Sequence, residues 1–293
     1  MDEPRVIPFR KSYNFCKKKD SRMKFQMVQP SGFLKKYIKD YCFMESDVYD
    51  EEVVERVIPT ENIQLMFHYK NPFVVFHSND SVIKQPRSII SGLSDHYSDV
   101  STAGETGVVF IRFHPAGACH FFHFPLSEIE NLSVDLTDLF NAEIRQIEEL
   151  LYLKNTIRER VMVIENFLIG RYSPIPSHDG LLIQKGIEIV KNHKGQTNAK
   201  YLSDCLYTSP KTLERKFAKY LGKTTKQLIK LIRFQEVLQN FRCVYELSMT
   251  EHAYKNGYFD QSHFIHDFKS YTGYTPTEFS TKYPDFNMDG ESC

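Results

Sequence analysis

The chain has 293 residues, of which 41% are apolar and 25% are charged, and its formal net charge at pH 7 is zero. This is the profile of a globular protein long enough for two domains of ordinary size. No apolar run approaches the eighteen or so residues of a membrane span, and the N-terminus lacks the apolar core of a secretory signal, so we expect a cytoplasmic protein with no membrane partner.

The net charge of zero conceals an uneven distribution along the chain. Residues 181–283 contain 16 Lys and Arg against 9 Asp and Glu, a net charge of +7, which the other residues offset at −7. Segregated charge of this kind favours an anionic partner for the C-terminal part. The alternative is a chance excess of surface lysine.

The first 26 residues are basic and lack a clear period, which indicates an N-terminal arm. From about Met27 to Phe124, runs such as NIQLMFHY, FVVFH and VVFIRFH alternate with turn sequences such as YKNP and HSND. This pattern predicts an antiparallel β unit, a small barrel or sandwich. Within FIRFH we expect Arg112 to pair with an acidic neighbour, the alternative being a contact with a buried anion. Apolar residues at helical spacing predict two helices over about 138–172, packed on the sheet or on a second copy of the chain.

A histidine cluster in this β-rich part raises a metal-binding alternative. His114, Cys119, His120 and His123 lie within ten residues, and His120 and His123 would share a face if the segment is helical. No carboxylate at ligand spacing joins them, and HFFHFP can equally be a half-buried segment whose phenylalanines pack. The six cysteines are far apart with no CxxC pair, which favours reduced packing thiols over disulfides or a thiolate zinc site. We therefore predict no metal and no cofactor.

A linker and a dense series of helix signals follow. SPIPSHDG at 173–180 holds two prolines and a glycine in eight residues and is predicted to be a linker. LLIQKGIEIV has apolar residues at helical spacing, and Thr197 can cap a short helix in NAKYLSDCLY. SPKTLERKFAKYLG then reads as a helix with Ser209 as N-cap, Pro210 at its first position and Gly222 at its end.

The remaining helix signals include one long helix and two capped ones. TTKQLIKLIRFQEVLQNF has apolar residues on one stripe, and SMTE at 248–251 is a capping box whose helix ends near Gly257. Asp260 then caps a final helix, QSHFIHDFKSYT, which we expect Gly273 to close and Pro276 to stop.

Two of the capped helices are related by an internal repeat. Two apolar residues four apart flank Arg215 in SPKTLERKF, and two flank His266 in DQSHFIHDF. When the two helices are aligned on their caps, Arg215 and His266 are equivalent, 51 residues apart, and each helix follows a short helix and a tight turn. This predicts two helix-turn-helix units whose paired apolar residues are buried and whose intervening residues face outward.

The second unit contains residue types that also occur in metal and catalytic sites. His263 and His266 are three apart, but Asp267 is adjacent to His266 and is expected to point elsewhere, which leaves that face without a third ligand or an orienting carboxylate. Short polar side chains in the first turns, with Lys269 further on, suit a helix in the major groove of DNA instead. We predict no catalytic residue.

At this point a family resemblance is evident. GYFDQSHFIHDFK followed by GYTP closely resembles the signature of AraC/XylS-type transcriptional regulators, and SPKTLERKF followed by LG resembles their first recognition helix. The resemblance covers about residues 181–280. It implies two helix-turn-helix units joined by a rigid linker helix, here roughly Thr225–Phe241, with the recognition helices in successive major grooves on one face of the duplex.

The resemblance also implies a DNA-binding set. By motif position, the base-facing residues are Lys211, Glu214, Arg215, Gln261, Ser262, Ile265 and His266. Basic residues expected to hold phosphates are Lys211, Lys216, Lys219 and Lys269, and Thr212 completes the set.

The sequence departs from the family pattern in the first unit. Tyr207 stands where the family usually has glycine, and Ser203 replaces a small apolar residue, so we expect the first turn to be strained or built differently. Glu214 is unusual on a DNA face. It either accepts from a cytosine amino group or pairs with a neighbouring lysine.

The N-terminal half carries a looser resemblance. PSGFLKKYIKDY, VIPTENIQLMFHY and GVVFIRFHPAGACHFFHFPLSEIENLSVDL resemble the sensory domain of one branch of these regulators, without naming a ligand. The predicted fold is α+β: a basic arm (1–26), a β-rich effector-binding or dimerisation domain with helices (27–172), a linker (173–180), an all-α DNA-binding domain (181–283) and a polar tail (284–293).

The implied function is that of a non-enzymatic, sequence-specific transcriptional regulator. Its expected partner is double-stranded DNA, and further candidates are a small-molecule effector, a second copy of the chain and RNA polymerase. Two alternatives stay open. One is a constitutive regulator whose N-terminal domain only dimerises, and the other is a metal-dependent β-domain enzyme fused to a DNA-binding module.

Overall fold

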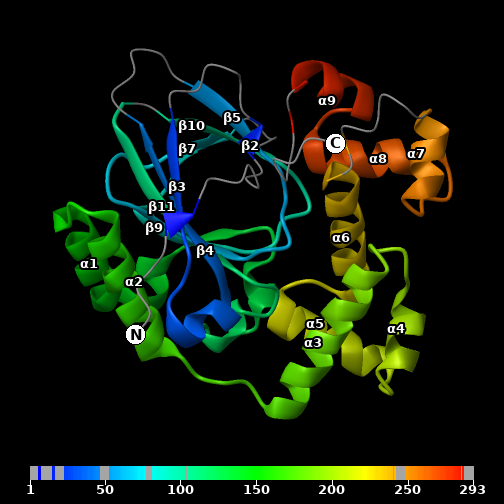
Figure 1. The fold of residues 1–293 in the computed structure, drawn as a ribbon, viewed down its shortest axis with the longest axis horizontal. Helices are drawn as coiled ribbons and strands as arrows, with labels where there is room; N and C mark the ends of the chain where they lie inside the picture. The colour runs from blue at the N-terminus through cyan, green and yellow to red at the C-terminus, as the bar shows by residue number, and fades with distance from the viewer. Residues whose placement is uncertain are drawn as a thin grey trace.

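The computed structural model describes residues 6–7, 15–16, 23–46, 53–76, 81–102, 104–239, 241, 248–284 and 286. The strands lie in the N-terminal half, and the helices of the C-terminal half form a separate group beside them (Figure 1). The α+β fold is thus confirmed. Most of the predicted basic arm and polar tail lies outside the described residues.

The described strands form two sheets, and every pairing between these strands is antiparallel, as predicted. The larger sheet has the order β1-β3-β4-β11-β6-β9-β12 and the smaller one β2-β5-β10-β7-β8. The larger sheet contains β1 (Val6–Ile7), β3 (Lys24–Val28), β4 (Ile38–Ser46), β6 (Gln64–His68), β9 (Ser88–Ser91), β11 (Thr106–Phe113) and β12 (Ser133–Asp135). The smaller sheet contains β2 (Phe15–Cys16), β5 (Val53–Val57), β7 (Val74–Phe76), β8 (Val82–Lys84) and β10 (Ser98–Thr102).

Side chains of the larger sheet alternate between two buried layers, because successive residues of a strand point to opposite faces. Met44 and Phe110 belong to a cluster that includes Phe73, next to the smaller sheet. The other face packs on α2, where the Tyr41 hydroxyl donates to Glu165 at 3.2 Å. Arg112 forms a buried bidentate pair with Asp40, at 2.7 Å for Nε–Oδ1 and 2.5 Å for Nη2–Oδ2, which confirms the predicted acidic partner.

Two helices, α1 (Leu136–Leu153) and α2 (Ile157–Arg171), cover the outer face of the larger sheet (Figure 1). The prediction of two helices in this region is confirmed, and in this chain they pack on the sheet. Short 3-10 helices, η1 (Gly32–Lys36), η2 (Ala118–His120) and η3 (Leu126–Ile129), connect the strands. No helix in the described ranges combines the length and apolar character needed to cross a membrane.

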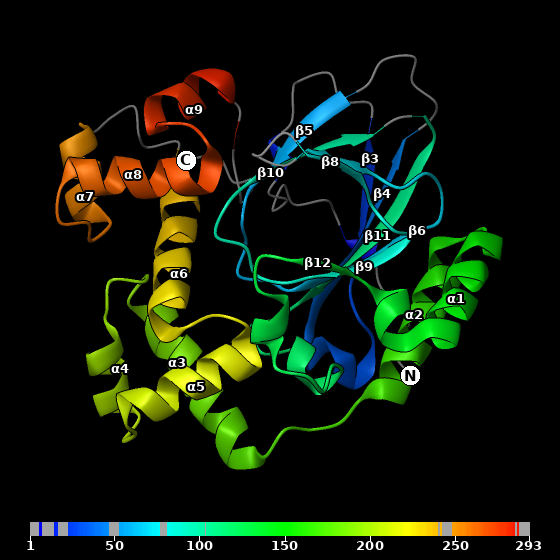
Figure 2. The same ribbon diagram turned by 180° about the vertical axis from the view of Figure 1, so that it is seen from behind.

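The C-terminal helices form two groups joined by α6, which stands between them in both views (Figures 1 and 2). The helices are α3 (Ser177–Asn192), α4 (Ala199–Cys205), α5 (Pro210–Leu221), α6 (Thr225–Gln239), α7 (Met249–Lys255), α8 (Gln261–Thr272) and α9 (Pro276–Lys282). The caps predicted at Ser209, Ser248 and Asp260 are confirmed. Helix α3 begins inside the segment predicted to be a linker.

Two local predictions were wrong. Asn198, not Thr197, caps α4, because its side chain accepts from the Tyr201 N–H at 2.9 Å. Pro276 does not end the chain's helices but opens α9, behind a capping box formed by Thr275 and Glu278. Proline suits the first position of a helix, where its missing N–H is not needed.

Candidate nucleic-acid interface

The α4–α5 and α7–α8 pairs repeat one local geometry. Ser209 caps α5 by accepting from the Thr212 N–H at 3.1 Å, and Asp260 caps α8 by accepting from the His263 N–H at 2.7 Å. Both recognition helices have 12 residues and end at a left-handed glycine, Gly222 and Gly273. The predicted duplication of the helix-turn-helix plan is therefore present in the structure.

The two turns are also built alike despite the missing glycine in the first. Tyr207 has φ +48° and Gly257 has φ +70°. In the first turn Thr208 N–H donates to Ser203 O at 3.1 Å, and in the second Tyr258 N–H donates to Ala253 O at 2.9 Å. The first turn thus follows the same path as the second and holds a tyrosine in the left-handed region, which agrees with the expectation of a strained turn and not with that of a turn built differently.

Ser203 also fits this turn. Its side chain is buried, and its hydroxyl donates to the Lys200 carbonyl at 2.8 Å inside α4. A hydroxyl that finds such a partner can replace a small apolar residue at little cost.

Most of the expected DNA-facing residues of α5 are exposed. Lys211, Arg215 and Lys219 are exposed and Thr212 is half-buried. Glu214 is exposed as well, but its Oε2 accepts from the Thr225 N–H at 3.3 Å, at the start of α6. Glu214 therefore contacts the first residue of α6, and not the neighbouring lysine that was the expected alternative.

Lys216 has a different environment from the other lysines of α5. Its ammonium pairs with Asp179 of α3, which also accepts from the Tyr220 hydroxyl at 2.8 Å. The Lys216 side chain is only 14% exposed. It therefore ties α5 to α3, and a phosphate contact would require this pair to open.

On α8 the expected face is open at its N-terminal end. Gln261, Ser262, His266 and Lys269 are exposed, whereas Ile265 is half-buried and packs against the core. The Gln261 side chain accepts from the Thr250 hydroxyl of α7 at 3.1 Å.

The expectation that Asp267 points away from the histidines was wrong. Its carboxylate is buried between α8 and α6, where Lys230 approaches it at 2.9 Å. His266 Nδ1 lies 3.6 Å and His263 Nε2 lies 3.7 Å from the same carboxylate. Asp267 is one turn from His263, and the ring of its sequence neighbour His266 also comes within reach. It therefore sits beneath the exposed face, with both imidazole rings near it.

The histidine cluster of the N-terminal half does not converge. His120 stacks on Tyr172 with ring centroids 6.0 Å apart, and the buried Cys119 thiol lies 3.0 Å from the Ala116 carbonyl. Burial raises the pKa of Cys119 to about 12. His123 is exposed. Across the described ranges, no three His, Cys, Asp or Glu side chains are grouped so that they could hold a metal ion.

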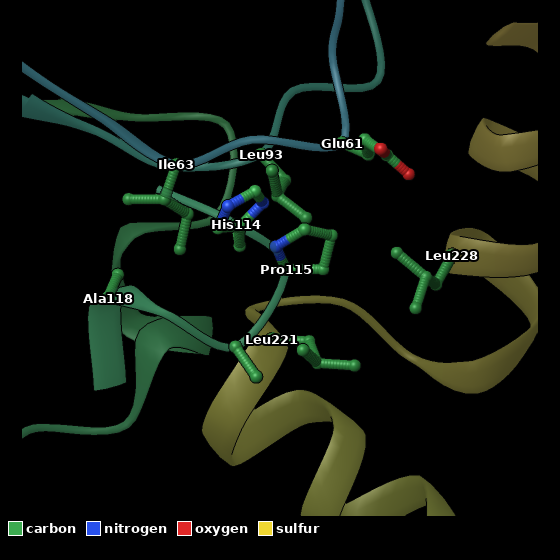
Figure 3. Close-up of a pocket in the computed structure, with 9 residues that line it drawn as sticks. Glu61, Ile63, Leu93, His114, Pro115, Ala118, Leu221 and Leu228 are labelled. Atoms are coloured by element: carbon green, nitrogen blue, oxygen red, sulfur yellow. The ribbon is translucent and has the colours of Figure 1, made fainter. Parts of the chain in front are cut away.

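A small pocket lies where the two halves meet (Figure 3). His114 and Pro115 line it from the β-rich half, and Leu221 and Leu228 from α5 and α6. Its cavity volume is about 10 Å³, room for about one water molecule. Small-molecule sites are typically about 300–1,000 Å³, so this pocket does not identify an effector site.

Two aromatic residues next to α5 and α8 are largely exposed: Tyr207 was named from the sequence for its position in the turn, and Phe259 was missed. Tyr207 is 98% exposed and Phe259 is 84% exposed. Phe259 directly precedes the Asp260 cap, where an apolar residue commonly packs against the helix. Only the structure shows that this ring is left open to solvent.

Comparisons with known proteins divide the chain in the same way. Residues 202–282 match a family described as a helix-turn-helix domain, and residues 26–135 match a domain of unknown function (DUF6597). An uncharacterised transcriptional regulatory protein of Bacillus subtilis, YesN, is 28% identical over 109 residues, which are 36% of this chain. The match covers only 30% of that relative's length.

Solved structures show similarity at low identity. ToxT from Vibrio cholerae is 15% identical with a TM-score of 0.42, over 83% of this chain and 98% of that one. The C-terminal domain of AraT, a response regulator from Geobacillus stearothermophilus, is 24% identical with a TM-score of 0.32, over 34% of this chain and 84% of that one.

Proposed function

We propose, from the premise that this chain is an AraC-type helix-turn-helix regulator, that α5 and α8 read two successive major-groove segments of one operator. The observation that carries the proposal is the repeated unit itself. Two capped helices of equal length present exposed polar and basic first turns, and the surrounding segment is basic. A helix N-terminus of this kind fits the major groove and attracts phosphates.

The proposal assigns different roles to the exposed side chains. Arg215, Gln261 and His266 read base edges, because the Arg and Gln side chains can form paired hydrogen bonds there and the imidazole can form a single one. The cations Lys211, Lys219 and Lys269 hold phosphates and position the helices. Thr212, Glu214, Ser262 and Ile265 border the same face.

The linker helix supports simultaneous docking of both units. Phe234 of α6 stacks on Tyr271 of α8, with centroids 4.4 Å apart, and meets Phe268 at 5.8 Å. Leu228 and Leu231 of α6 are buried in the same core. Helix α6 is therefore packed against its neighbours, so it can carry a fixed offset between the recognition helices.

Selection of bound duplexes from a random pool by the full chain, at physiological salt, tests the proposal. We expect a motif with two half-elements about one helical turn apart. Gln261→Ala and His266→Ala should each relax preference at one or two base pairs, by about 1–3 kcal/mol. His263→Ala, on the same helix but outside the base-facing set, is the control and should keep the motif. Full specificity in both test variants, or no enriched motif for the wild type, would contradict the proposal.

We further propose that an effector bound between the two sheets controls DNA binding. Ser46 and Thr106, which are paired across β4 and β11, face this layer together with His68 and Met44. The hydroxyls of Ser46 and Thr106 and Nδ1 of His68 are buried without a hydrogen-bond partner among the described residues. Buried polar groups of this kind usually find a partner, and a polar ligand would supply one.

The alternatives make different predictions for the purified protein. A constitutive regulator would bind no small molecule in the N-terminal half, so saturable binding of any compound there removes that alternative. A metal-dependent enzyme would contain stoichiometric zinc, iron or manganese, which elemental analysis measures directly.

A further inference from the structure

The C-terminal ends of the two recognition helices are equivalent by the internal repeat and both face the sheets. Gly222 ends α5 and Gly273 ends α8, 51 residues later. In Figure 2 both helices run with these ends toward the β-rich half and their N-terminal ends away from it. One loop of the β-rich half, residues 92–97 between β9 and β10, contacts both places.

At the end of α5, the contact is a buried ion pair. Lys223 follows Gly222 and its side chain is fully buried. Its ammonium lies 2.7 Å from Asp95 of the loop and 2.8 Å from Glu130. The backbone at the end of α5 also lies close to the β-rich half: a Cβ added to Gly222 would lie 3.0 Å from the Leu126 carbonyl oxygen.

At the end of α8, the contact is an aromatic and guanidinium stack. A Cβ on Gly273 would lie 2.5 Å from the ring of Tyr97, the last residue of the loop. Arg56 lies over that ring at 3.9 Å and donates to the Thr272 carbonyl at 3.0 Å. Asp99 holds the same guanidinium by two hydrogen bonds of 2.7 Å.

The loop itself is fixed. The Asp95 N–H donates to the Asn131 side chain at 2.8 Å, and the Ser94 hydroxyl donates to the His96 carbonyl at 2.8 Å. Gly92 is packed against the Ile129 backbone, where no side chain would fit. A fixed loop that contacts both helix ends can set the distance and angle between them.

We propose that loop 92–97 is a positioning element for DNA reading: it fixes α5 and α8 relative to each other and thereby sets which half-element spacing the full chain prefers. The inference rests on the proposed function, because spacing has meaning only if both helices read DNA. Helix α6 sets the approximate distance between α5 and α8. The loop restricts the remaining motion of these two helices by holding their C-terminal ends. Adding one base pair between half-elements shifts them by about 3.4 Å and about 35°, so a fixed pair of helices should discriminate such duplexes.

The test uses the full chain and the duplex selected by the wild type, together with duplexes shortened or lengthened by one base pair between the half-elements. We expect the wild type to prefer the selected spacing. In the double variant Asp95→Asn, Tyr97→Ala, the ratio of affinities between the selected duplex and the altered ones should fall toward one. Affinity for an isolated half-element should stay unchanged. Lys223→Arg keeps the charge and should retain the wild-type ratio.

Glu61→Gln is the matched control, because the ion pair of Glu61 across the same interface, at 2.6 Å, is with Lys191 of α3 and not with a recognition helix. It should leave the spacing preference intact. An unchanged preference in the double variant would overturn the inference and leave spacing to α6 alone. An equal loss in Glu61→Gln would also overturn it, because the effect would then belong to the interface as a whole. Absence of any selected motif for the wild type would instead refute the proposed function.

Discussion

Tyr207 occupies a backbone conformation that suits glycine. Its φ is +48° and the residue is 98% exposed, so little packing offsets the conformational cost. A non-glycine residue there costs about 1–2 kcal/mol, while a glycine costs about 0.5–1 kcal/mol through the entropy of the unfolded chain. We therefore expect Tyr207→Gly to raise the free energy of unfolding by about 0.5–1 kcal/mol in urea denaturation.

The control for Tyr207→Gly is the same substitution at Tyr254, which is 63% exposed inside α7. There the backbone is helical, so glycine should lower the free energy of unfolding by about 1 kcal/mol. Loss of stability at both positions would show that the first turn is not strained.

His68 is a buried histidine whose charge state should govern part of the acid sensitivity. It is 4% exposed, its Nε2 lies 3.1 Å from the Gln85 amide oxygen, and burial lowers its pKa to about 4. The unfolded chain takes up a proton near pH 6.5, whereas the folded chain does so only near pH 4. As the pH falls through this window, this group alone should remove about 3 kcal/mol of stability.

His68→Gln removes the titrating group and can keep a hydrogen bond to Gln85. Denaturation midpoints measured from pH 7 to pH 4 should therefore fall less steeply in the variant than in the wild type. Parallel slopes for the two proteins would mean that His68 does not carry this dependence.

At the scale of elements, most helix starts could be predicted because their signals are local. Ser209, Ser248 and Asp260 each lie three residues before the N–H that they accept from, so the sequence alone contains both partners. The errors have local causes too. Thr197 and Asn198 are adjacent cap formers, and only the backbone path decides between them. A proline can either stop a helix or occupy its first position. Pro276 does the second, because the Thr275 cap begins α9 there.

Side-chain partners between elements could not be predicted in the same way. Lys216 and Asp179 are 37 residues apart in sequence, and Lys230 and Asp267 are also 37 apart. Nothing in their local sequence distinguishes these lysines from the exposed ones of the same basic segment. Their ion pairs depend on how α3, α5, α6 and α8 pack.

Helix α5 therefore offers two lysines that should behave differently when DNA binds. Lys219 is exposed, whereas Lys216 is paired with Asp179. Lys219→Ala should weaken binding to all sequences alike and reduce the slope of log K against log salt by about 1. Lys216→Ala should instead lower the melting temperature and leave that slope nearly unchanged. Titrations at several salt concentrations measure the slope, and an equal change in both variants would contradict this assignment.

For the whole molecule, the sequence indicated the division into a β-rich and a helical half but not the contact between them. The charge count treated all lysines of the helical half as surface cations. Lys223 is one of them, yet it is fully buried against Asp95 and Glu130 of the other half. The larger of the two clusters of buried apolar residues likewise spans both halves, from Val28 to Tyr283. Such a junction follows from tertiary packing, which no local pattern encodes.

A shared core and a buried ion pair should make the two halves unfold together. We expect a single calorimetric transition for the wild type. Lys223→Ala leaves two partly buried carboxylates without their cation, so it should cost about 2–4 kcal/mol and separate the unfolding of the two halves into distinct transitions. Lys70→Ala is the matched control: its pair with Glu105 has a similar distance, 2.6 Å, but is exposed. Exposed pairs contribute about 0–1 kcal/mol, so this variant should keep one transition near the wild-type temperature. One unshifted transition in Lys223→Ala would show that the apolar contacts alone couple the halves.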